Sequence, residues 1–190
     1  MRILAFTITF VALTVSAFAA PPVPRKSPEL TITDPSGKQI LLSSFKGKVV
    51  VVPLMFTTCP HCQAEAKMLT KLQTEFAGRG LQVVGTAFND EANGPVVAQF
   101  IKEFNVGFPV GYSSRASVIS YLGLSVMDRW VVPQVAVIDR KGMIVAQSDA
   151  LGTVELQTES YMRTLIDKLL KEGATTSSTA PAKKSVAKTD

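Results

Sequence analysis

The chain has 190 residues, a formal net charge of +5 and 46% hydrophobic residues, which suits one globular domain. The positive excess is modest, and no stripe of lysine or arginine alternates with aromatic residues, which argues against a nucleic-acid partner. Two cysteines and one histidine are too few ligands for a structural zinc site, and we expect neither a metal nor a cofactor.

Residues 1–19 have the pattern of a secretory signal peptide. Arg2 precedes an uncharged apolar stretch over residues 3–18, and Ala17 and Ala19 supply the small side chains of a cleavage point. A retained membrane anchor is the alternative, but the stretch is shorter than the roughly 20 residues that span a bilayer. We therefore expect cleavage, export to the periplasm or the extracellular space, and no stable membrane insertion afterwards.

Composition divides the rest of the chain into three parts. Residues 20–28 are rich in proline and predict an extended linker. Residues 29–172 contain the apolar periodic segments and predict a single domain. Residues 173–190 hold almost nothing to bury and predict a disordered tail.

Within the domain, strand and helix patterns alternate. Two short strands over 30–33 and 39–42 flank the turn sequence Asp34-Pro35-Ser36-Gly37 and predict a hairpin. The elements expected after it are a buried strand over 48–55, a helix over 60–76, a strand over 81–88, helices over 95–104 and 115–121, a strand pair over 134–138 and 143–147, and a helix over 154–170 that ends before Gly173. Together they predict a mixed three-layer α/β sheet. Because proline lacks an N–H, Pro53 predicts a bulge or a local end of pairing in its strand.

The sequence Cys59-Pro60-His61-Cys62 falls where the buried strand gives way to a helix. Two thiols at this spacing can form a reversible disulfide, with the first sulfur among unpaired helix N-terminal amides. A structural staple is the alternative, but closing so short a loop restrains the unfolded chain by at most about 2 kcal/mol. A lone histidine is more often a surface or core residue, yet here we expect the partial charge of His61 to favour the Cys59 thiolate.

Taken together, these motifs resemble the thioredoxin superfamily, in particular its exported TlpA-like and redoxin branch. The resemblance rests on the segments 33–38 and 45–50, on Cys59-Pro60-His61-Cys62 followed by Glu65, and on Val132-Pro133 before the strand that begins at Gln134. The tetrapeptide itself is also carried by exported oxidants of the DsbA type. The resemblance implies a thioredoxin-like fold, with a central mixed β-sheet flanked by helices and an N-terminal β-hairpin extension.

The resemblance also implies roles for individual residues. Cys59 would be the attacking thiolate and Cys62 the buried resolving thiol. Pro133 would follow a cis peptide bond, with the backbone of Val132 pairing with an extended substrate. Thr58 replaces the usual tryptophan before the first cysteine, and Pro53 stands where many relatives place a buried acid or an asparagine, so the sequence offers no proton relay there.

We therefore predict an exported thiol–disulfide oxidoreductase that exchanges disulfides with cysteine-containing protein substrates and is recycled by a separate redox partner. A peroxiredoxin-like thiol peroxidase is one alternative. Its pattern Pro-x-x-x-Thr/Ser-x-x-Cys is one residue out of register here, because Pro53 and Thr57 lie six and two residues before Cys59. A thioredoxin-fold binding or scaffold protein without turnover is the other alternative. The direction of the redox reaction stays open between oxidant and reductant.

Overall fold

The computed structural model describes residues 20–127 and 129–177, with side chains described up to residue 172. The strands are β1 Arg25–Lys26, β2 Thr31–Thr33, β3 Gln39–Leu41, β4 Val49–Met55, β5 Leu81–Val83, β6 Gly85–Ala87, β7 Val110–Tyr112, β8 Gln134–Ile138 and β9 Met143–Gln147. The α-helices are α1 Pro60–Phe76, α2 Gly94–Phe104, α3 Arg115–Leu122 and α4 Glu159–Ser177, and short 3-10 turns cover Leu42–Phe45, Ala77–Arg79 and Val154–Gln157. The predicted signal peptide 1–19 and residues 178–190 lie outside the described residues.

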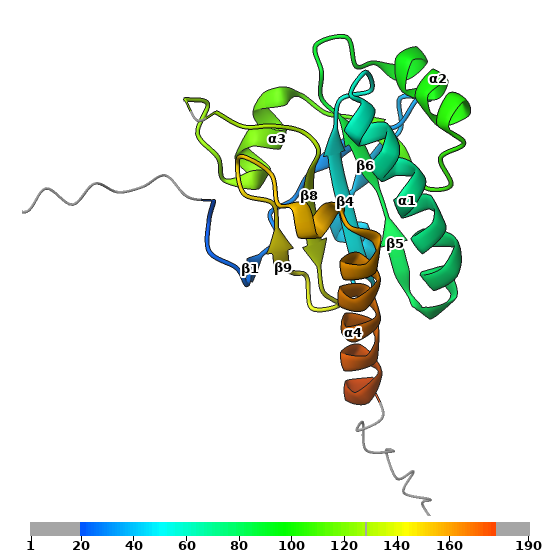
Figure 1. Ribbon diagram of the computed structural model, residues 1–190, viewed down its shortest axis with the longest axis vertical. Helices are drawn as coiled ribbons and strands as arrows, with labels where there is room; N and C mark the ends of the chain where they lie inside the picture. The colour runs from blue at the N-terminus through cyan, green and yellow to red at the C-terminus, as the bar shows by residue number, and fades with distance from the viewer. Residues whose placement is uncertain (1–19, 128, 178–190) are drawn as a thin grey trace, which may run out of the picture.

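The strands of the described residues form one mixed sheet (Figure 1). Its order is β1-β9-β8-β4-β6-β7-β2-β3, with β5 also paired to β4. The central strand β4 runs parallel to β5 and β6 and antiparallel to β8. The β2–β3 hairpin extends the far edge by pairing Thr33 with Tyr112 of β7. This architecture confirms the predicted thioredoxin-like α/β fold and its N-terminal hairpin.

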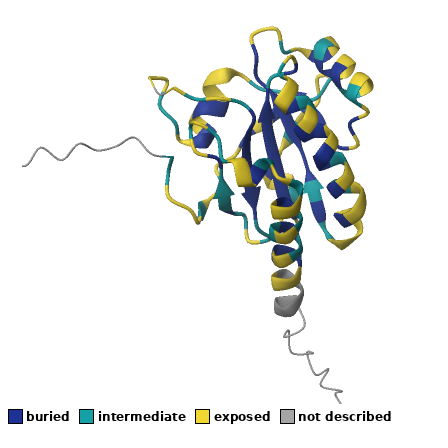
Figure 2. Cartoon of the chain, viewed as in Figure 1, coloured by how far each residue is buried: buried dark blue, intermediate teal, exposed yellow. Residues whose placement is uncertain are grey.

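Alternation along β4 gives the sheet two apolar faces, because successive side chains of a strand point to opposite sides. All seven residues of β4 are buried (Figure 2). Val49 and Val51 pack with residues of α1, α2 and α4, including Leu69, Phe100 and Ile166. On the other face, side chains such as Val50 and Val52 pack with α3 and the hairpin segment, through Tyr121, Leu122, Leu30 and Ile32. The sheet is therefore covered on both faces and forms the middle of three layers.

The strand predicted over 81–88 is divided into β5 and β6 around Val84. The division lies opposite Pro53: β4 pairs with β5 through Val51 and resumes pairing with β6 at Leu54. On its other side, Pro53 lies directly opposite Val135 in an unbroken register with β8. The expected local end of pairing is thus found on the parallel side of β4, where a missing N–H interrupts the ladder.

The described termini of the domain differ from the prediction. Residues 20–28, expected to be a linker, instead pack against the domain, since β1 pairs with β9 and the Ser27 N–H donates to the Gly142 carbonyl at 2.9 Å. The last helix begins as the 3-10 turn Val154–Gln157 and continues as α4 through Gly173 to Ser177, so the predicted start of a disordered tail at 173 is too early. Across the described residues, no helix combines the length and apolar character needed to cross a bilayer.

Candidate active site

Cys59 occupies the N-cap position of α1, and Pro60 follows at the first helical position, where its fixed backbone angle and missing N–H are tolerated. A turn over residues 56–59 joins β4 to this helix and is closed by the Cys59 N–H, which donates to the Phe56 carbonyl at 3.2 Å. Both cysteines are free thiols. Cys59 is half-buried, whereas Cys62, one turn into the helix, is fully buried.

The buried thiol of Cys62 and the half-buried thiol of Cys59 lie close enough to interact. Burial raises the pKa of the Cys62 thiol far above its ordinary value, because a thiolate would lose its hydration there. A hydrogen bond with Cys59 and the negative charges of Cys59 and Glu65 add to the rise, while a hydrogen bond from the Phe56 backbone opposes it. Cys62 is therefore held as a protonated thiol when the pair is reduced.

Glu65 is buried beside this pair, with 4% of its surface exposed. It belongs to the sheet-facing side of α1 that also carries Cys62, Ala66 and Leu69. Among the described residues, neither of its carboxyl oxygens has a hydrogen-bond partner. Burial, followed by the negative charge of Cys59, raises the pKa of Glu65 well above its usual range. A buried, protonated carboxyl next to two thiols can hold or release a proton for them.

Glu65 is a buried acid near the thiols, whereas the position at which many relatives have a buried acid is occupied here by Pro53. The sequence analysis named Glu65 only as part of a motif and gave it no role. A signal was nevertheless present, because a glutamate three residues after Cys62 falls on the apolar stripe of an amphipathic helix. An acid at such a position is rarely left buried without a function.

Val132 and Pro133 lie beside Cys59, as the resemblance implied. The peptide bond between them is cis, and the Cys59 thiol donates to the Val132 carbonyl at 3.9 Å. The fully buried Gln134 holds this loop in place. Its side-chain amide donates to the carbonyls of Val131, Asp149 and Ala150 at 2.8, 3.1 and 3.2 Å. Gln134 is a supporting residue that the sequence analysis did not identify, because its partners lie on a distant loop.

His61 is exposed on the first turn of α1, and within the described residues it makes no hydrogen bond or ion pair. Its expected effect on Cys59 therefore stays a prediction. The same part of the chain holds no group of three histidine, cysteine, aspartate or glutamate side chains arranged to bind a metal ion.

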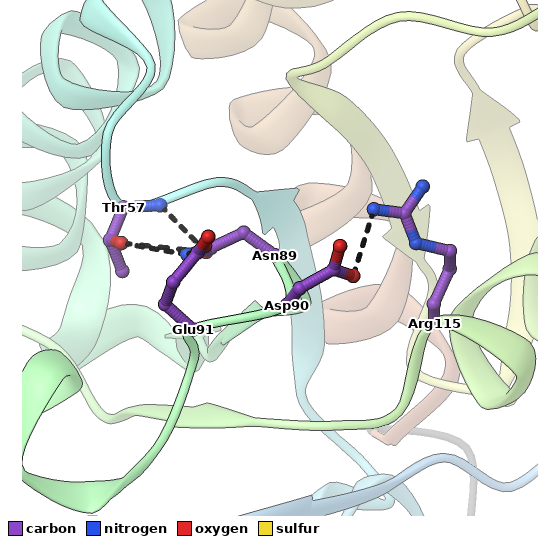
Figure 3. A network of polar contacts seen from close by, with 5 residues as sticks. All are labelled: Thr57, Asn89, Asp90, Glu91 and Arg115. Carbon is purple, nitrogen blue, oxygen red and sulfur yellow. Dashed lines mark hydrogen bonds and ion pairs between the residues drawn. The ribbon is translucent and has the colours of Figure 1, made fainter.

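An aromatic cluster adjoins the site although the tryptophan usual before the first cysteine is replaced by Thr58. Phe56 packs edge-on against Phe88 and Trp130, with ring centroids 4.9 and 6.2 Å apart. The Arg115 guanidinium lies over the rings of Phe56 and Trp130 and pairs with Asp90 at 3.2 Å (Figure 3). These residues come from three loops and the first position of α3, so no local pattern could have joined them.

A cleft of about 250 Å³ separates the turn before Cys59 from α2. Its lining residues are Thr57, Thr58, Gln63, Val96, Gln99, Phe100, Glu103 and Phe104. The cleft borders the residue that precedes Cys59, so it lies within reach of a molecule docked at that sulfur. A smaller cavity of about 110 Å³ beside Lys48 and Val50 lies at the other end of β4, away from the thiols.

Known proteins are similar to this chain in fold and in sequence. The chain is 26% identical over 139 residues to the thiol-disulfide oxidoreductase ResA of Bacillus thuringiensis subsp. konkukian, which covers 73% of this chain and 76% of the relative. It is 27% identical over 157 residues to the chloroplastic Peroxiredoxin Q of Triticum aestivum, covering 68% and 67% of the two chains. A thioredoxin-family thiol:disulfide interchange protein from Chlorobium tepidum TLS superposes with a TM-score of 0.64 at 24% identity, over 80% of this chain and 99% of that one.

The fold, the two adjacent thiols and these likenesses define an oxidoreductase of the thioredoxin superfamily that acts on thiols and disulfides. The Redoxin family profile matches residues 22–173. The chain belongs to the Redoxin family.

Proposed function

We propose that the protein exchanges disulfides with cysteine-containing polypeptides through a redox pair formed by Cys59 and Cys62. The observation that carries the proposal is the placement of a half-buried thiol at a helix N-terminus, where it interacts with a buried thiol and with the buried carboxyl of Glu65. An exposed sulfur can meet a substrate, and a buried one is reserved for resolving the intermediate.

In the oxidising direction, a substrate thiolate attacks the Cys59 sulfur of the disulfide form. A substrate–Cys59 bond forms, the Cys59–Cys62 bond breaks, and Cys62 leaves with the electron pair. The Glu65 carboxyl supports this step by giving the buried sulfur a proton. A second substrate thiolate then attacks the substrate sulfur and releases Cys59, so that the substrate becomes a disulfide. The proton of one substrate thiol ends on Cys59, and that of the other restores the Glu65 carboxyl, whose own proton is now on Cys62. The reverse sequence reduces a substrate.

The Val132–Pro133 loop is proposed as the substrate groove. The Val132 carbonyl faces the Cys59 sulfur at 3.9 Å, so a peptide whose cysteine reaches that sulfur passes within hydrogen-bonding distance of this backbone. Extended peptides commonly dock by pairing their main chain with such free backbone groups. The groove therefore supports polypeptide substrates and leaves their side chains to the neighbouring surface.

The roles of the two sulfurs can be tested with Cys59→Ser and Cys62→Ser. Cys59→Ser removes the attacked atom, so exchange with a dithiol peptide is expected to fall to the uncatalysed rate. Cys62→Ser keeps the attacking sulfur but lacks the resolving one, so it is expected to accumulate mixed disulfides visible on non-reducing gels and by mass spectrometry. Normal exchange by Cys59→Ser, or a Cys62→Ser variant that never traps a substrate, would contradict the assignment.

Peroxide reduction is the second candidate, and the likeness to Peroxiredoxin Q favours testing it. Measuring both reactions with the wild-type protein decides between the two functions. If the wild-type protein consumed hydrogen peroxide faster than it exchanged peptide disulfides, the peroxidase function would replace the one proposed here. If it did neither but still bound reduced peptides, it would act as a binding protein.

We further propose that the protein works outside the cytoplasm, in the periplasm or the extracellular space. The support is the signal-like pattern of residues 1–19, which lie outside the described residues. Cell fractionation combined with N-terminal sequencing tests this directly. An unprocessed chain confined to the cytoplasm would contradict export and would place the thiols in a reducing compartment.

A further inference from the structure

The turn over residues 56–59 gives each thiol a backbone contact. Its closing hydrogen bond runs from the Cys59 N–H to the Phe56 carbonyl at 3.2 Å. The other polar group of Phe56 serves the second thiol. Burial raises the pKa of Cys62, and a hydrogen bond from the Phe56 backbone opposes that rise. The shape of this one turn therefore affects both sulfurs.

Thr57, the residue after Phe56, is held on both sides of its backbone. Its N–H donates to the Asn89 side-chain oxygen at 3.1 Å, and its carbonyl accepts from the Gln63 side-chain amide at 3.1 Å. The Asn89 amide nitrogen also donates to the Thr57 hydroxyl at 3.2 Å. Thr57 and Asn89 are each only 7% exposed, and Figure 3 shows their side by side arrangement. The two side chains come from different elements, since Gln63 lies on α1 and Asn89 follows β6.

The Asn89 amide has a fixed orientation because its polar atoms are all occupied. Its oxygen accepts from Thr57, and its nitrogen donates both to Thr57 and to the Glu91 carboxylate at 3.1 Å. The bond to Glu91 also lowers the pKa of that exposed carboxyl. An amide has two N–H donors, and both are used here. Asn89 therefore acts as a rigid brace between a surface loop and the turn before Cys59.

We infer that Asn89 and Gln63 are positioning residues of the redox site, which set its reduction potential by fixing Thr57 and, through it, the turn over residues 56–59 that holds Cys59 at the N-terminus of α1. Neither side chain touches a reacting atom. The inference rests on the proposed redox pair. The amides at a helix N-terminus stabilise negative charge on Cys59 in the reduced pair more than they stabilise the disulfide, so the braced turn makes the disulfide a stronger oxidant.

The test is the equilibrium of the purified protein with defined ratios of reduced and oxidised glutathione. Asn89→Ala removes three hydrogen bonds of the brace, and Gln63→Ala removes the one on the other side. Each is expected to shift the equilibrium constant toward the disulfide by up to about fivefold, the size of the interaction of a charge with a helix N-terminus. The shift in the double variant is expected to be smaller than the sum of the two single shifts, because both substitutions act on Thr57.

Glu91→Gln is the matched control. Its amide oxygen still accepts from Asn89 while the carboxylate is lost, so the brace remains and the equilibrium constant is expected to stay within about twofold of the wild type. Chemical unfolding of the oxidised and reduced forms separates positioning from general support. Substitution of a residue that only stabilises the fold lowers the stability of both redox forms equally and leaves the reduction potential unchanged.

The inference is overturned if both alanine variants keep the wild-type equilibrium constant while the wild type exchanges disulfides. It is also overturned if they lose stability equally in both redox forms. Should Asn89→Ala not fold, Gln63→Ala alone decides, because Gln63 is only half-buried and its loss opens no core cavity. A wild type that forms no Cys59–Cys62 disulfide in any glutathione buffer contradicts the proposed function instead.

Discussion

Glu65 is a buried carboxyl whose position beside the thiols suits proton transfer but destabilises the folded protein. A carboxyl that is 4% exposed and has no hydrogen-bond partner resists ionisation, and the negative charge of Cys59 resists it further. The same features that suit it to the proposed role of proton carrier for Cys62 also destabilise the folded protein. Active sites commonly hold groups whose ionisation has been shifted in this way.

The cost predicts a dependence of stability on pH. Below the unfolded-state pKa of about 4.5, Glu65 is protonated in both states and contributes no difference. As the pH rises, the unfolded chain loses this proton while the folded protein keeps it. The free energy of unfolding then falls by about 1.4 kcal/mol for each pH unit, until the raised folded-state pKa is reached. Glu65→Gln should remove this loss.

The measurement is urea unfolding of wild type and Glu65→Gln between pH 4 and pH 8. The stability of the variant relative to wild type is expected to rise with pH above about 4.5 and to level off once the pH passes the raised folded-state pKa of Glu65. Glu103→Gln, which removes an exposed carboxylate on α2, is the control for the change in net charge. A constant difference between wild type and Glu65→Gln at all pH values would show that Glu65 ionises normally and cannot act as the proposed proton carrier.

The sequence was sufficient to place the two cysteines and the loop at Val132–Pro133 together. These residues belong to short contiguous motifs, so a resemblance carries their positions. It was not sufficient for Gln134, Asn89 or Trp130, because each contacts residues more than ten positions away and only the packed fold brings them close. Glu65 is the intermediate case, since its helical spacing was visible in the sequence but its burial was not.

The strands and helices follow their local patterns where packing does not interfere. The boundaries of β8, β9 and α1 match the prediction, because continuous apolar runs or a sharp proline start define them. The strand predicted over 81–88 is divided because Pro53, on the neighbouring strand, cannot complete the ladder. A strand's own sequence does not report what its neighbour lacks.

The hairpin edge depends on a glycine in β7. A Cβ atom on Gly111 would lie 2.3 Å from the Thr33 carbonyl oxygen and 2.6 Å from the Ile32 side chain. Gly111→Ala is therefore expected to push the β2–β3 hairpin away from the sheet and to lower the free energy of unfolding by about 1–3 kcal/mol. Hydrogen exchange of the β2 amides, measured with urea unfolding, checks both effects.

Gly78→Ala provides the comparison for this change. A Cβ at Gly78 meets nothing within 4 Å, so this substitution is expected to be neutral or to stabilise by about 0.4–1 kcal/mol through the unfolded chain. If the two alanine variants had equal stability, the close approach of β7 to the hairpin would not be a constraint on the fold.

The two thiols and the described ends of the domain lie at different parts of the molecule. The loop that joins β4 to α1 is at the top of Figure 1, whereas the foot of α4 is at the bottom. The N-terminal segment is fastened to the β9 edge of the sheet by β1. The described ends of the domain thus lie away from the loop that carries Cys59.

Arg25 is the main anchor of this N-terminal segment. Its guanidinium donates to the Tyr121 carbonyl at 2.9 Å and to the Gln147 side chain at 2.5 Å, and so joins β1 to α3 and β9. Hydrogen bonds from a charged donor contribute about 1.5–3 kcal/mol each, but one buried guanidinium nitrogen has no partner and offsets part of this gain. We expect Arg25→Ala to lower the free energy of unfolding by about 1–2 kcal/mol.

The neighbouring residue supplies the control, because the exposed side chain of Lys26 makes no contact of this kind, and Lys26→Ala is expected to change stability by less than about 0.5 kcal/mol. Hydrogen exchange of the Ser27 amide, which donates to Gly142 at 2.9 Å, should speed up in Arg25→Ala alone. The rate of disulfide exchange at Cys59 should stay unchanged, because β4 and β8 separate the segment from the thiols. Equal effects of the two substitutions would mean that β1 is held by backbone pairing, while slower disulfide exchange in Arg25→Ala would mean that the N-terminal segment is coupled to the redox site through the sheet.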